Sequence, residues 1–387
     1  MSGALTEGNR LVLLESGGEY FPALLAAIEA ARHEVWLESY IFRLDEIGRQ
    51  VVEALVRAAR RGVRVRVLLD GFGSRHFPRE VARGLRREGV QLLFYRPELG
   101  LLRLRRYRLR RLHRKLALID ARVGFVGGIN VIDDRNAGSP DHPAYDFAVQ
   151  VEGPVVADIW QAMQRLWWLV RWSRLGRRPR QGKGLPPCTE AVGGQAAQFL
   201  TRDNLRHRRD IERAYLKAIG TARKEIILAN AYFLPGRRFR HALVHAARRG
   251  VRVSLLMQGY TDHPYYKLAA RALYRHFLDH GVEIREYHAG FLHAKVAVVD
   301  EDWATVGSSN IDPFSLLLSR EANLVVRDQR FTAELRASLT RAIEAGTHRI
   351  HHQALSRIPW YERLASWVLY NAIRVATGLT GYARGGL

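Results

Sequence analysis

The sequence predicts an α/β protein made of two similar layered units that are related by pseudo-two-fold symmetry. Three observations lead to this prediction: the halves of the chain repeat one another, short β-branched runs alternate with helical periodicity, and one polar motif recurs at matching places. The 387 residues suffice for two or three domains, and the 47% hydrophobic content favours a folded chain over a disordered one.

An eight-residue stretch is the strongest sign of the repeat. Residues 58–65 read AARRGVRV, and residues 246–253 read the same. Between the halves, residues 177–187 are basic and rich in glycine and proline, which is typical of a linker. We therefore expect four segments, listed here in chain order: an N-terminal domain over 1–176, a linker over 177–190, a C-terminal domain over 191–350 and an amphipathic segment over 351–387.

The elements follow from the local pattern of each half. Helical periodicity predicts helices over residues 19–32, 47–61 and 77–88. Short β-branched and apolar runs predict strands in the first half over 63–69, 90–95, 116–119, 123–126 and 147–151. Similar runs predict strands in the second half over 226–228, 251–257, 282–287, 296–299 and 322–326. This alternation predicts a mostly buried sheet flanked by helices in each half.

Composition limits the possible partners. With 61 basic and 38 acidic residues the net charge is +23, so the surface should attract anions such as nucleic acid, acidic lipids or phosphorylated molecules. The single cysteine excludes an internal disulfide framework. We see neither a signal peptide nor an uninterrupted apolar run of membrane-spanning length, so we expect a reducing compartment and only peripheral membrane contact.

Each half contains one copy of the pattern H-x-K-x4-D, followed by a glycine-containing turn and an asparagine. The first copy comprises His113, Lys115, Asp120 and Asn130, and the second comprises His293, Lys295, Asp300, Ser308 and Asn310. On a strand, residues i and i+2 share a face, so each histidine should point the same way as its lysine. Because only six of the 61 basic residues are lysines, lysine at both matched positions argues for a functional role.

These residue types suit a phosphate better than a metal ion. A protonated lysine offers no lone pair and repels a cation, so histidine with lysine is a poor metal site. The same lysine neutralises phosphate oxygens, amides and hydroxyls donate to them, and histidine attacks or transfers a proton. The motifs therefore predict phosphoryl chemistry with no metal and no cofactor.

The paired motifs resemble the duplicated signature of the phospholipase D superfamily, over nearly the whole chain. Within it, residues 37–42, 69–74, 112–116 and 307–315 are similar to bacterial cardiolipin synthases of the subgroup without N-terminal membrane helices. The resemblance implies two phospholipase D-like α/β/α sandwich domains with the active site at their interface. There His113 would be the nucleophile and His293 the general acid and base.

The resemblance also implies roles for the remaining polar residues. Lys115, Lys295, Asn130 and Asn310 would bind the phosphate oxygens, and Ser308 would be a further donor. A downstream carboxylate would orient each histidine, Asp146 for His113 and Glu321 for His293. We expect Asp120 and Asp300, the last residues of the motifs, to orient local structure rather than touch substrate.

The implied reaction is transfer of a phosphatidyl group between two phosphatidylglycerol molecules, through a phosphohistidine, to give cardiolipin and glycerol. We expect the protein to act peripherally on the cytoplasmic face of a bacterial cytoplasmic membrane, with phosphatidylglycerol as its lipid partner. The basic run 103–111 leads into His113 and favours a lipid-facing site. In the C-terminal segment, one helical face fits a membrane interface and core packing equally well; it carries Trp360, Leu364, Trp367, Val368, Val375 and Leu379.

Three alternatives remain open from the sequence. Water in place of the acceptor lipid would make the protein a phospholipase D-type hydrolase. A nucleic-acid phosphodiesterase would use the same motifs and charge, although the subgroup match and the tryptophan-bearing segment disfavour nucleic acid as a partner. Two intact motifs argue against a non-catalytic anion-binding protein.

Overall fold

The computed structural model describes residues 3–97, 110–139, 141–175, 185–203, 207–260, 264–312, 319–356 and 358–377. In the first half the strands are β1 (Thr6–Glu15), β2 (Glu34–Ser39), β3 (Arg64–Asp70), β4 (Gln91–Tyr95), β5 (Arg111–Leu112), β6 (Lys115–Ile119), β7 (Val123–Gly127), β8 (Ala144–Tyr145) and β9 (Phe147–Glu152). The helices of this half are α1 (Ser16–Ala30), α2 (Glu46–Arg60), α3 (Arg79–Arg87), α4 (Asp134–Ala137) and α5 (Val156–Leu175).

The second half repeats this order. Its strands are β10 (Gln195–Arg202), β11 (Glu225–Asn230), β12 (Arg252–Gln258), β13 (Glu283–Tyr287), β14 (Phe291–Leu292), β15 (Lys295–Val299), β16 (Trp303–Gly307), β17 (Ser319–Arg327) and β18 (Thr347–Arg349). Its helices are α6 (Asp210–Thr221), α7 (Arg237–Arg248), α8 (Pro264–Leu278), α10 (Gln329–Gly346), α11 (His352–Ser356) and α12 (Trp360–Thr377).

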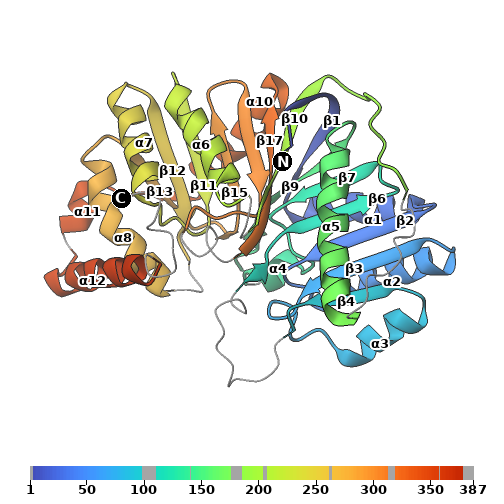
Figure 1. Cartoon of the computed structure of the whole chain (residues 1–387). Coiled ribbons are helices and arrows are strands. Elements are labelled where there is room, and N and C mark those ends of the chain that lie inside the picture. Colours follow the sequence, from blue (N-terminus) through green and yellow to red (C-terminus); the bar gives the residue numbers. More distant parts are fainter. Residues whose placement is uncertain are drawn as a thin grey trace.

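One continuous sheet runs through both halves (Figure 1). Its strand order is β18-β13-β12-β11-β15-β16-β17-β10-β1-β9-β7-β6-β2-β3-β4. Apart from β18 at one edge, this order is the same when read outward in either direction from the antiparallel pair β1–β10, which joins the halves. The predicted pseudo-two-fold relation is therefore confirmed, and the two units share a sheet rather than only an interface.

The exact eight-residue repeat encodes the same local structure twice. It contains the end of a helix, a glycine and the start of a strand, at α2–β3 in one half and α7–β12 in the other. Gly62 and Gly250 have φ angles of +87° and +88°, in the left-handed region that glycine adopts without steric cost. The repeat is thus a helix end followed by a buried parallel strand.

Helices cover both faces of the sheet. In the first half α1, α2 and α3 pack on one face, and in the second half α6, α7 and α8 do so. On the other face, α5 and α10 join a single apolar core to which strands of both halves contribute. The shared core holds the halves in a fixed relation, which matters because the functional motifs come from both.

Most predicted elements are confirmed, with ends that differ by a few residues. The predicted helices correspond to α1, α2 and α3, and all the predicted strands are present. The sequence analysis missed the strands β1, β2, β10 and β16 and the short strands β5, β8, β14 and β18. Of the expected linker, residues 177–184 lie outside the described part of the chain.

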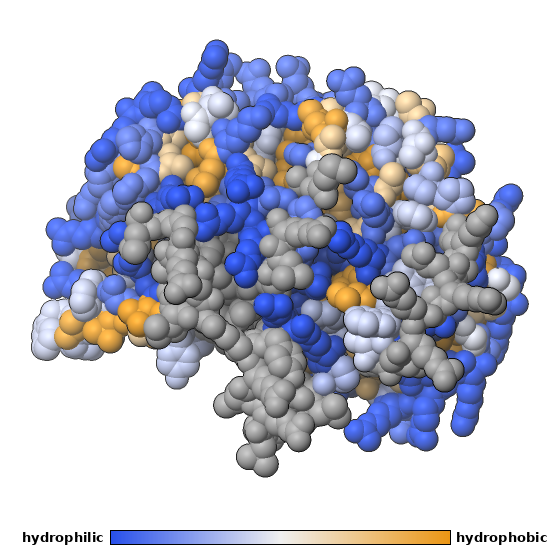
Figure 2. Space-filling model, viewed as in Figure 1, coloured by the Kyte–Doolittle hydropathy of each residue, from blue (hydrophilic) through white to orange (hydrophobic). Residues whose placement is uncertain are grey.

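The C-terminal helix presents two different faces. Ser366 and Tyr370 are buried, and this side of α12 packs against α8. Five apolar side chains of the segment singled out from the sequence point outward instead, with 51–69% of their surface exposed: Trp360, Leu364, Trp367, Val368 and Val375. Figure 2 shows this apolar patch at the edge of the molecule where Figure 1 places α12. Leu379 lies outside the described residues.

No helix within the described residues is both long enough and apolar enough to cross a membrane.

Candidate active site

Two short strands bring the motifs of the two halves together. β5, directly before His113, pairs with the start of β17, and the His113 amide donates to the Arg320 carbonyl oxygen at 3.0 Å. β14, directly before His293, pairs with β8, and the His293 amide donates to the Tyr145 carbonyl oxygen at 2.9 Å. Each histidine is therefore anchored to the opposite half of the chain.

The carboxylates that orient the histidines are exchanged between the halves. Nδ1 of His113 lies 3.0 Å from Glu321 Oε2, and Nδ1 of His293 lies 2.6 Å from Asp146 Oδ2. The sequence led us to expect each carboxylate beside the histidine of its own half, and that pairing is wrong. The cause is the strand pairing, because each carboxylate comes one residue after the carbonyl that accepts the other half's histidine amide.

Both motif lysines are buried next to the histidines. Nζ of Lys295 lies 2.8 Å from His293 Nδ1 and 3.2 Å from Asp146 Oδ2, and it also donates to the His293 carbonyl oxygen. Lys115 is 3% exposed and donates to the His113 carbonyl oxygen at 2.7 Å. Two lysines held this close to the histidines favour an anion between them.

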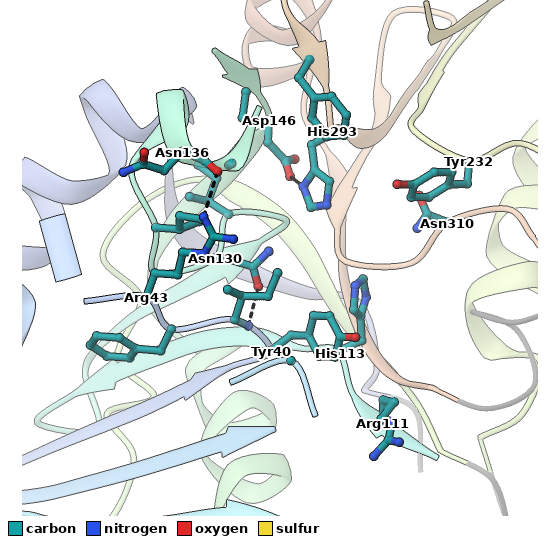
Figure 3. A pocket seen from close by; sticks show the side chains of 18 of the residues that line it. Tyr40, Arg43, Arg111, His113, Asn130, Asn136, Asp146, Tyr232, His293 and Asn310 are labelled. Atoms are coloured by element: carbon teal, nitrogen blue, oxygen red, sulfur yellow. Dashed lines mark hydrogen bonds and ion pairs between the residues drawn. The ribbon is translucent and has the colours of Figure 1, made fainter. Parts of the chain in front are cut away.

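The histidines face one cavity of about 490 Å³ between the halves. In Figure 3 the rings of His113 and His293 point into the same space, and Asn130 and Asn310 approach it from either half. Because each Nδ1 faces a carboxylate, Nε2 is the ring nitrogen left to react in each histidine. Tyr40 lies edge-on against His113, with ring centres 4.9 Å apart.

The two asparagines lie where a phosphate between the histidines would need donors. Asn130 accepts the Ile41 amide through Oδ1 at 3.0 Å, which leaves its amide nitrogen for a ligand. Asn310 is 4% exposed, and its side-chain oxygen has no hydrogen-bond partner among the described residues. A phosphodiester offers only acceptor oxygens, so the side-chain amide nitrogens of the two asparagines, and not this oxygen, are the groups that could bind it.

Burial and like charge weaken protonation throughout the site. Burial lowers the pKa of His293 to about 4, with repulsion from Lys295 adding to the effect and Asp146 opposing it. Burial also lowers the pKa of His113, although Glu321 opposes that shift. Burial, assisted by Lys295, lowers the pKa of Lys115 to about 7. The free site is therefore poised to gain protons when an anion binds.

Asp146 behaves differently from the cations around it. Burial by itself would raise the pKa of this carboxyl group, but Lys295 and His293 more than compensate and hold the pKa below its ordinary value. Asp146 therefore stays ionised, and its negative charge keeps the hydrogen of His293 on Nδ1.

Ser308 does not have the position that the sequence suggested. Its hydroxyl is fully buried, donates to Glu321 Oε2 at 2.6 Å, and accepts the Ala322 amide at 3.0 Å. The expected phosphate donor therefore supports the carboxylate that orients His113. At the matching position Gly128 has no room for a side chain, because a Cβ atom there would lie 2.3 Å from Asp146 Oδ1.

Asp120 and Asp300 orient local structure, as expected, and neither lines the cavity. The Asp120 carboxylate accepts the amides of residues 32–34 at 2.8 Å, and the Asp300 carboxylate accepts the amides of residues 223–225 at 2.7–3.0 Å. Both have positive φ angles, near +50°, which aspartate tolerates better than most residues. They hold the turn after the motif strand against the neighbouring strand of the sheet.

Sequence reasoning gave no role to several side chains that line the cavity, including Tyr40, Arg75, Tyr232 and Phe291. The position of Phe291, two residues before His293, was a usable signal because i and i+2 share a face of a strand. The basic run expected to face lipid lies mainly outside the described residues. Its last two members, Arg110 and Arg111, are described, and Arg111 lines the cavity.

Comparison with known proteins agrees with this geometry. A family model described as cardiolipin synthase, PLD-like domain, matches residues 24–167 and 215–343. The chain is 40% identical to cardiolipin synthase B of Escherichia coli strain K12 over 386 residues, which covers 97% of this chain and 90% of the relative. The chain belongs to the cardiolipin synthase family of phospholipase D-like proteins. It is also 30% identical to cardiolipin synthase 1 of Staphylococcus epidermidis, over 94% of this chain and 74% of that protein.

Solved structures share the fold of this family member. Phosphatidylserine synthase of Haemophilus influenzae matches with a TM-score of 0.72 and 14% identity, over 97% of both chains. Polyphosphate kinase of Porphyromonas gingivalis matches with a TM-score of 0.61 and 14% identity, over 96% of this chain and 53% of that one. Together with the family model, which matches both halves of the chain, this likeness in fold confirms the expected duplicated phospholipase D-like architecture.

Proposed function

We propose that this protein is a cardiolipin synthase that transfers a phosphatidyl group from one phosphatidylglycerol molecule to another. The observation that carries the proposal is the pair of oriented histidines facing one cavity, with a buried lysine beside each. Family membership supports the substrate class, because the relatives are cardiolipin synthases over nearly the full chain.

The first step forms a covalent intermediate. A phosphodiester bound between Lys115 and Lys295 supplies the negative charge that the free site lacks, so it raises the pKa of the histidines and lysines around it. Nε2 of His113 attacks phosphorus and the bond from phosphorus to the glycerol oxygen breaks. Protonated His293 gives its Nε2 proton to that oxygen, and free glycerol leaves. Glu321 stabilises the positive charge on the phosphorylated His113 ring.

The second step returns the enzyme to its starting state. The neutral His293 accepts the proton from a hydroxyl group of the acceptor phosphatidylglycerol, whose oxygen attacks phosphorus. The bond between phosphorus and Nε2 of His113 breaks, and cardiolipin is formed. Water in the same position would give phosphatidic acid, so the acceptor decides between transfer and hydrolysis.

Peripheral attachment to an anionic membrane fits the surface. The exposed apolar face of α12 includes two tryptophans, and the exposed Arg363 and Arg374 lie on the same helix. Tryptophan favours the membrane interface, and arginine is attracted to anionic headgroups. In Figure 1, α12 lies along the same edge of the molecule as α4, whose residues line the cavity. We propose that this edge meets the cytoplasmic face of a bacterial membrane.

Incubation of the purified protein with phosphatidylglycerol vesicles tests the function. Mass spectrometry should show cardiolipin and glycerol appearing together in equal amounts. The His113→Asn/His293→Asn double variant is the matched control and should form neither product. Phosphatidic acid without cardiolipin would contradict the proposed transferase and indicate a hydrolase. Cleavage of labelled DNA in a parallel reaction would indicate a nucleic-acid phosphodiesterase.

A further inference from the structure

The two ends of the cavity differ at a position where the fold is symmetric. Arg111 lies two residues before His113, and Phe291 lies two residues before His293. Both line the cavity, and both start a short strand that pairs with the opposite half. One end of the site is therefore cationic where the matching end is aromatic.

Arg75 joins Arg111 at the cationic end. Cζ of each arginine lies 4.7 Å from the centre of the Phe72 ring, so both guanidinium groups contact one aromatic ring, the Phe72 platform. Both arginines line the same cavity as the histidines. In Figure 3, His113 lies between His293 and Arg111, so Arg111 is beyond the histidine pair rather than within it.

A buried carboxylate fixes the geometry of this platform. Asp70 is fully buried, and its Oδ1 accepts the amides of Phe72 and Gly73 at 2.9 and 3.0 Å. Its Oδ2 accepts the Leu112 amide at 2.7 Å. The loop that carries Phe72 and the strand that carries Arg111 are thus held by one carboxylate.

The second half makes the same bridge with a neutral group. Gln258 accepts the Leu292 amide through Oε1 at 3.0 Å. Beyond it, the cavity is lined by Phe291 and by Tyr232 and Tyr266, whose ring centres are 5.5 Å apart. The two ends therefore differ both in the side chains that line the cavity and in the group that supports them. One end has two arginines supported by a carboxylate, and the other has aromatic rings supported by a neutral amide.

The proposed reaction requires an asymmetric site. When cardiolipin forms, the attacked phosphate lies between the histidines, and the acceptor lipid brings a second phosphate that is separated from the first by a three-carbon glycerol. This second phosphate is anionic throughout and does not react. We propose that Arg75 and Arg111 bind the phosphate of the acceptor phospholipid. This inference rests on the proposed function and names a binding site for its second substrate.

The position and chemistry of the two arginines suit this role. Arg75 is exposed, whereas the side chain of His113 is only 16% exposed. The two arginines therefore lead from the buried centre of the cavity towards solvent. The acceptor must follow such a path, because its acyl chains stay in the membrane while its hydroxyl group reaches the phosphorus. Arginine forms paired, charge-assisted hydrogen bonds with phosphate oxygens, and contact with the Phe72 ring positions both guanidinium groups.

Comparing acceptors with and without a phosphate tests the proposal. The Arg75→Gln/Arg111→Gln variant and wild type are assayed in neutral detergent micelles with a nitrophenyl phosphatidyl ester as donor. Nitrophenol release reports the first step, and phosphatidylglycerol or 1-butanol serves as the acceptor in the second. Cardiolipin formation should fall about tenfold or more through a higher KM for phosphatidylglycerol, while nitrophenol release and phosphatidylbutanol formation change less than twofold.

A matched control and the reverse reaction sharpen the test. Arg79 is exposed, does not line the cavity and lies four residues from Arg75, so Arg79→Gln should leave all three rates unchanged. By microscopic reversibility, cleavage of cardiolipin by glycerol should fall in the double variant as much as its synthesis does.

Several results would overturn the proposal. An equal loss of all three rates would show that the arginines bind the reacting phosphate or support the fold, and a thermal melt separates these causes. Unchanged cardiolipin formation would show that no acceptor phosphate binds there. If wild type transfers to butanol and never to phosphatidylglycerol, the proposed function itself fails, and this result does not depend on the variant.

Discussion

His113 and His293 hold equivalent places in the fold but have different surroundings. His293 shares Asp146 with Lys295, whereas His113 is paired with Glu321, which also accepts the Ser308 hydroxyl. In both histidines the carboxylate beside Nδ1 favours the Nδ1–H tautomer, while the charge balance around the two rings differs. Such a difference is expected when one ring attacks phosphorus and the other transfers protons.

A donor with an acidic leaving group separates the two roles. We expect His113→Asn and His293→Asn each to abolish turnover of phosphatidylglycerol. With a nitrophenyl phosphatidyl ester, which needs no proton on its leaving group, His293→Asn should release one equivalent of nitrophenol and stop, because the base of the second step is missing. Intact-mass analysis at neutral pH should then show a phosphatidyl adduct.

The opposite result is equally informative. A burst and an adduct in His113→Asn, and not in His293→Asn, would make His293 the nucleophile. If neither variant forms an adduct, the covalent mechanism is wrong.

The lowered pKa of Lys115 predicts pH-dependent anion binding. Above about pH 7 this lysine loses its proton in the free site, so an anion that needs the charge must bind together with a proton. The affinity for tungstate should therefore fall as pH rises from 6 to 9. The fall should be shallower in Lys115→Arg, because arginine stays protonated. Isothermal calorimetry measures both affinity and proton uptake, with the exposed Lys217→Arg as control. Equal slopes in all three proteins would contradict this assignment.

The chemistry of the side chains also predicts indifference to chelators. In the proposed mechanism histidine supplies the nucleophile and the acid, lysine and asparagine supply the charge and hydrogen bonds that the phosphate needs, and two lysines repel a cation. Cardiolipin formation should therefore continue at its full rate after exhaustive treatment with EDTA. Loss of activity that a divalent ion restores would contradict the metal-free mechanism.

At the scale of elements, β6 uses its two faces differently. Lys115 begins the strand beside the site, while Arg114, one residue earlier, points the other way and makes two 2.8 Å hydrogen bonds to Glu38 of β2. This ion pair is buried. The matching positions of the second half are Ala229 and Ala294, so an apolar contact can replace the pair in this fold.

A single and a double variant test that interpretation. Arg114→Met should lower the free energy of unfolding by about 3–5 kcal/mol, because it leaves the Glu38 carboxylate buried without its partner. Glu38→Leu/Arg114→Met should recover most of this loss. Arg57→Met, which breaks the exposed pair with Glu29, is the control and should cost about 0–1 kcal/mol. Urea unfolding gives all three values, and a double variant less stable than Arg114→Met would contradict the prediction.

Local patterns predicted most elements but not those that join the halves. The predicted helices and most inner strands were recognised because each carries its own periodicity or β-branched run, whereas the inner strands β2 and β16 were missed. β1 combines Gly8 and Asn9 with an apolar run over 11–14, and β10 is rich in alanine and glutamine, so neither has the composition of a buried strand along its whole length. Their pairing with each other and with β9 and β17 stabilises them, and such long-range pairing leaves no local signal.

The candidate site shows the same limit. The repeat predicted the histidines, lysines and asparagines because their spacing is preserved in both copies. The exchange of Asp146 and Glu321, and the turn of the Ser308 hydroxyl towards Glu321, depend on strands that pair across the halves. Residue spacing along one half carries no information about the partner that the other half supplies.

At the scale of the whole molecule, charge and the exposed face of α12 predict how the protein binds vesicles. Association should rise with phosphatidylglycerol content and weaken with salt, since charges are screened over about 8 Å at physiological ionic strength. Trp360→Ser/Trp367→Ser should weaken binding about tenfold or more, because burying a large apolar side chain contributes about 1.5–3 kcal/mol. Vesicle sedimentation measures both effects.

A tryptophan elsewhere on the surface provides the control. Trp172 on α5 is 51% exposed, and Trp172→Ser should leave vesicle binding unchanged. Equal binding to neutral and anionic vesicles would contradict the electrostatic part of this prediction. Unchanged binding of the α12 variant would show that its exposed face does not meet the membrane.

The exchange of carboxylates has a consequence for how such a chain can arise and be divided. A fragment that ends before the linker contains His113 without Glu321, and the other fragment contains His293 without Asp146, so neither is a smaller enzyme. Two copies of one half, related by the two-fold axis that relates the halves here, would each supply the carboxylate that orients the histidine of the other copy. The chain thus has the plan of a symmetric homodimer fused in tandem. Because both copies lie in one chain, matching positions can carry different residues, as Arg111 and Phe291 do, which two identical subunits cannot.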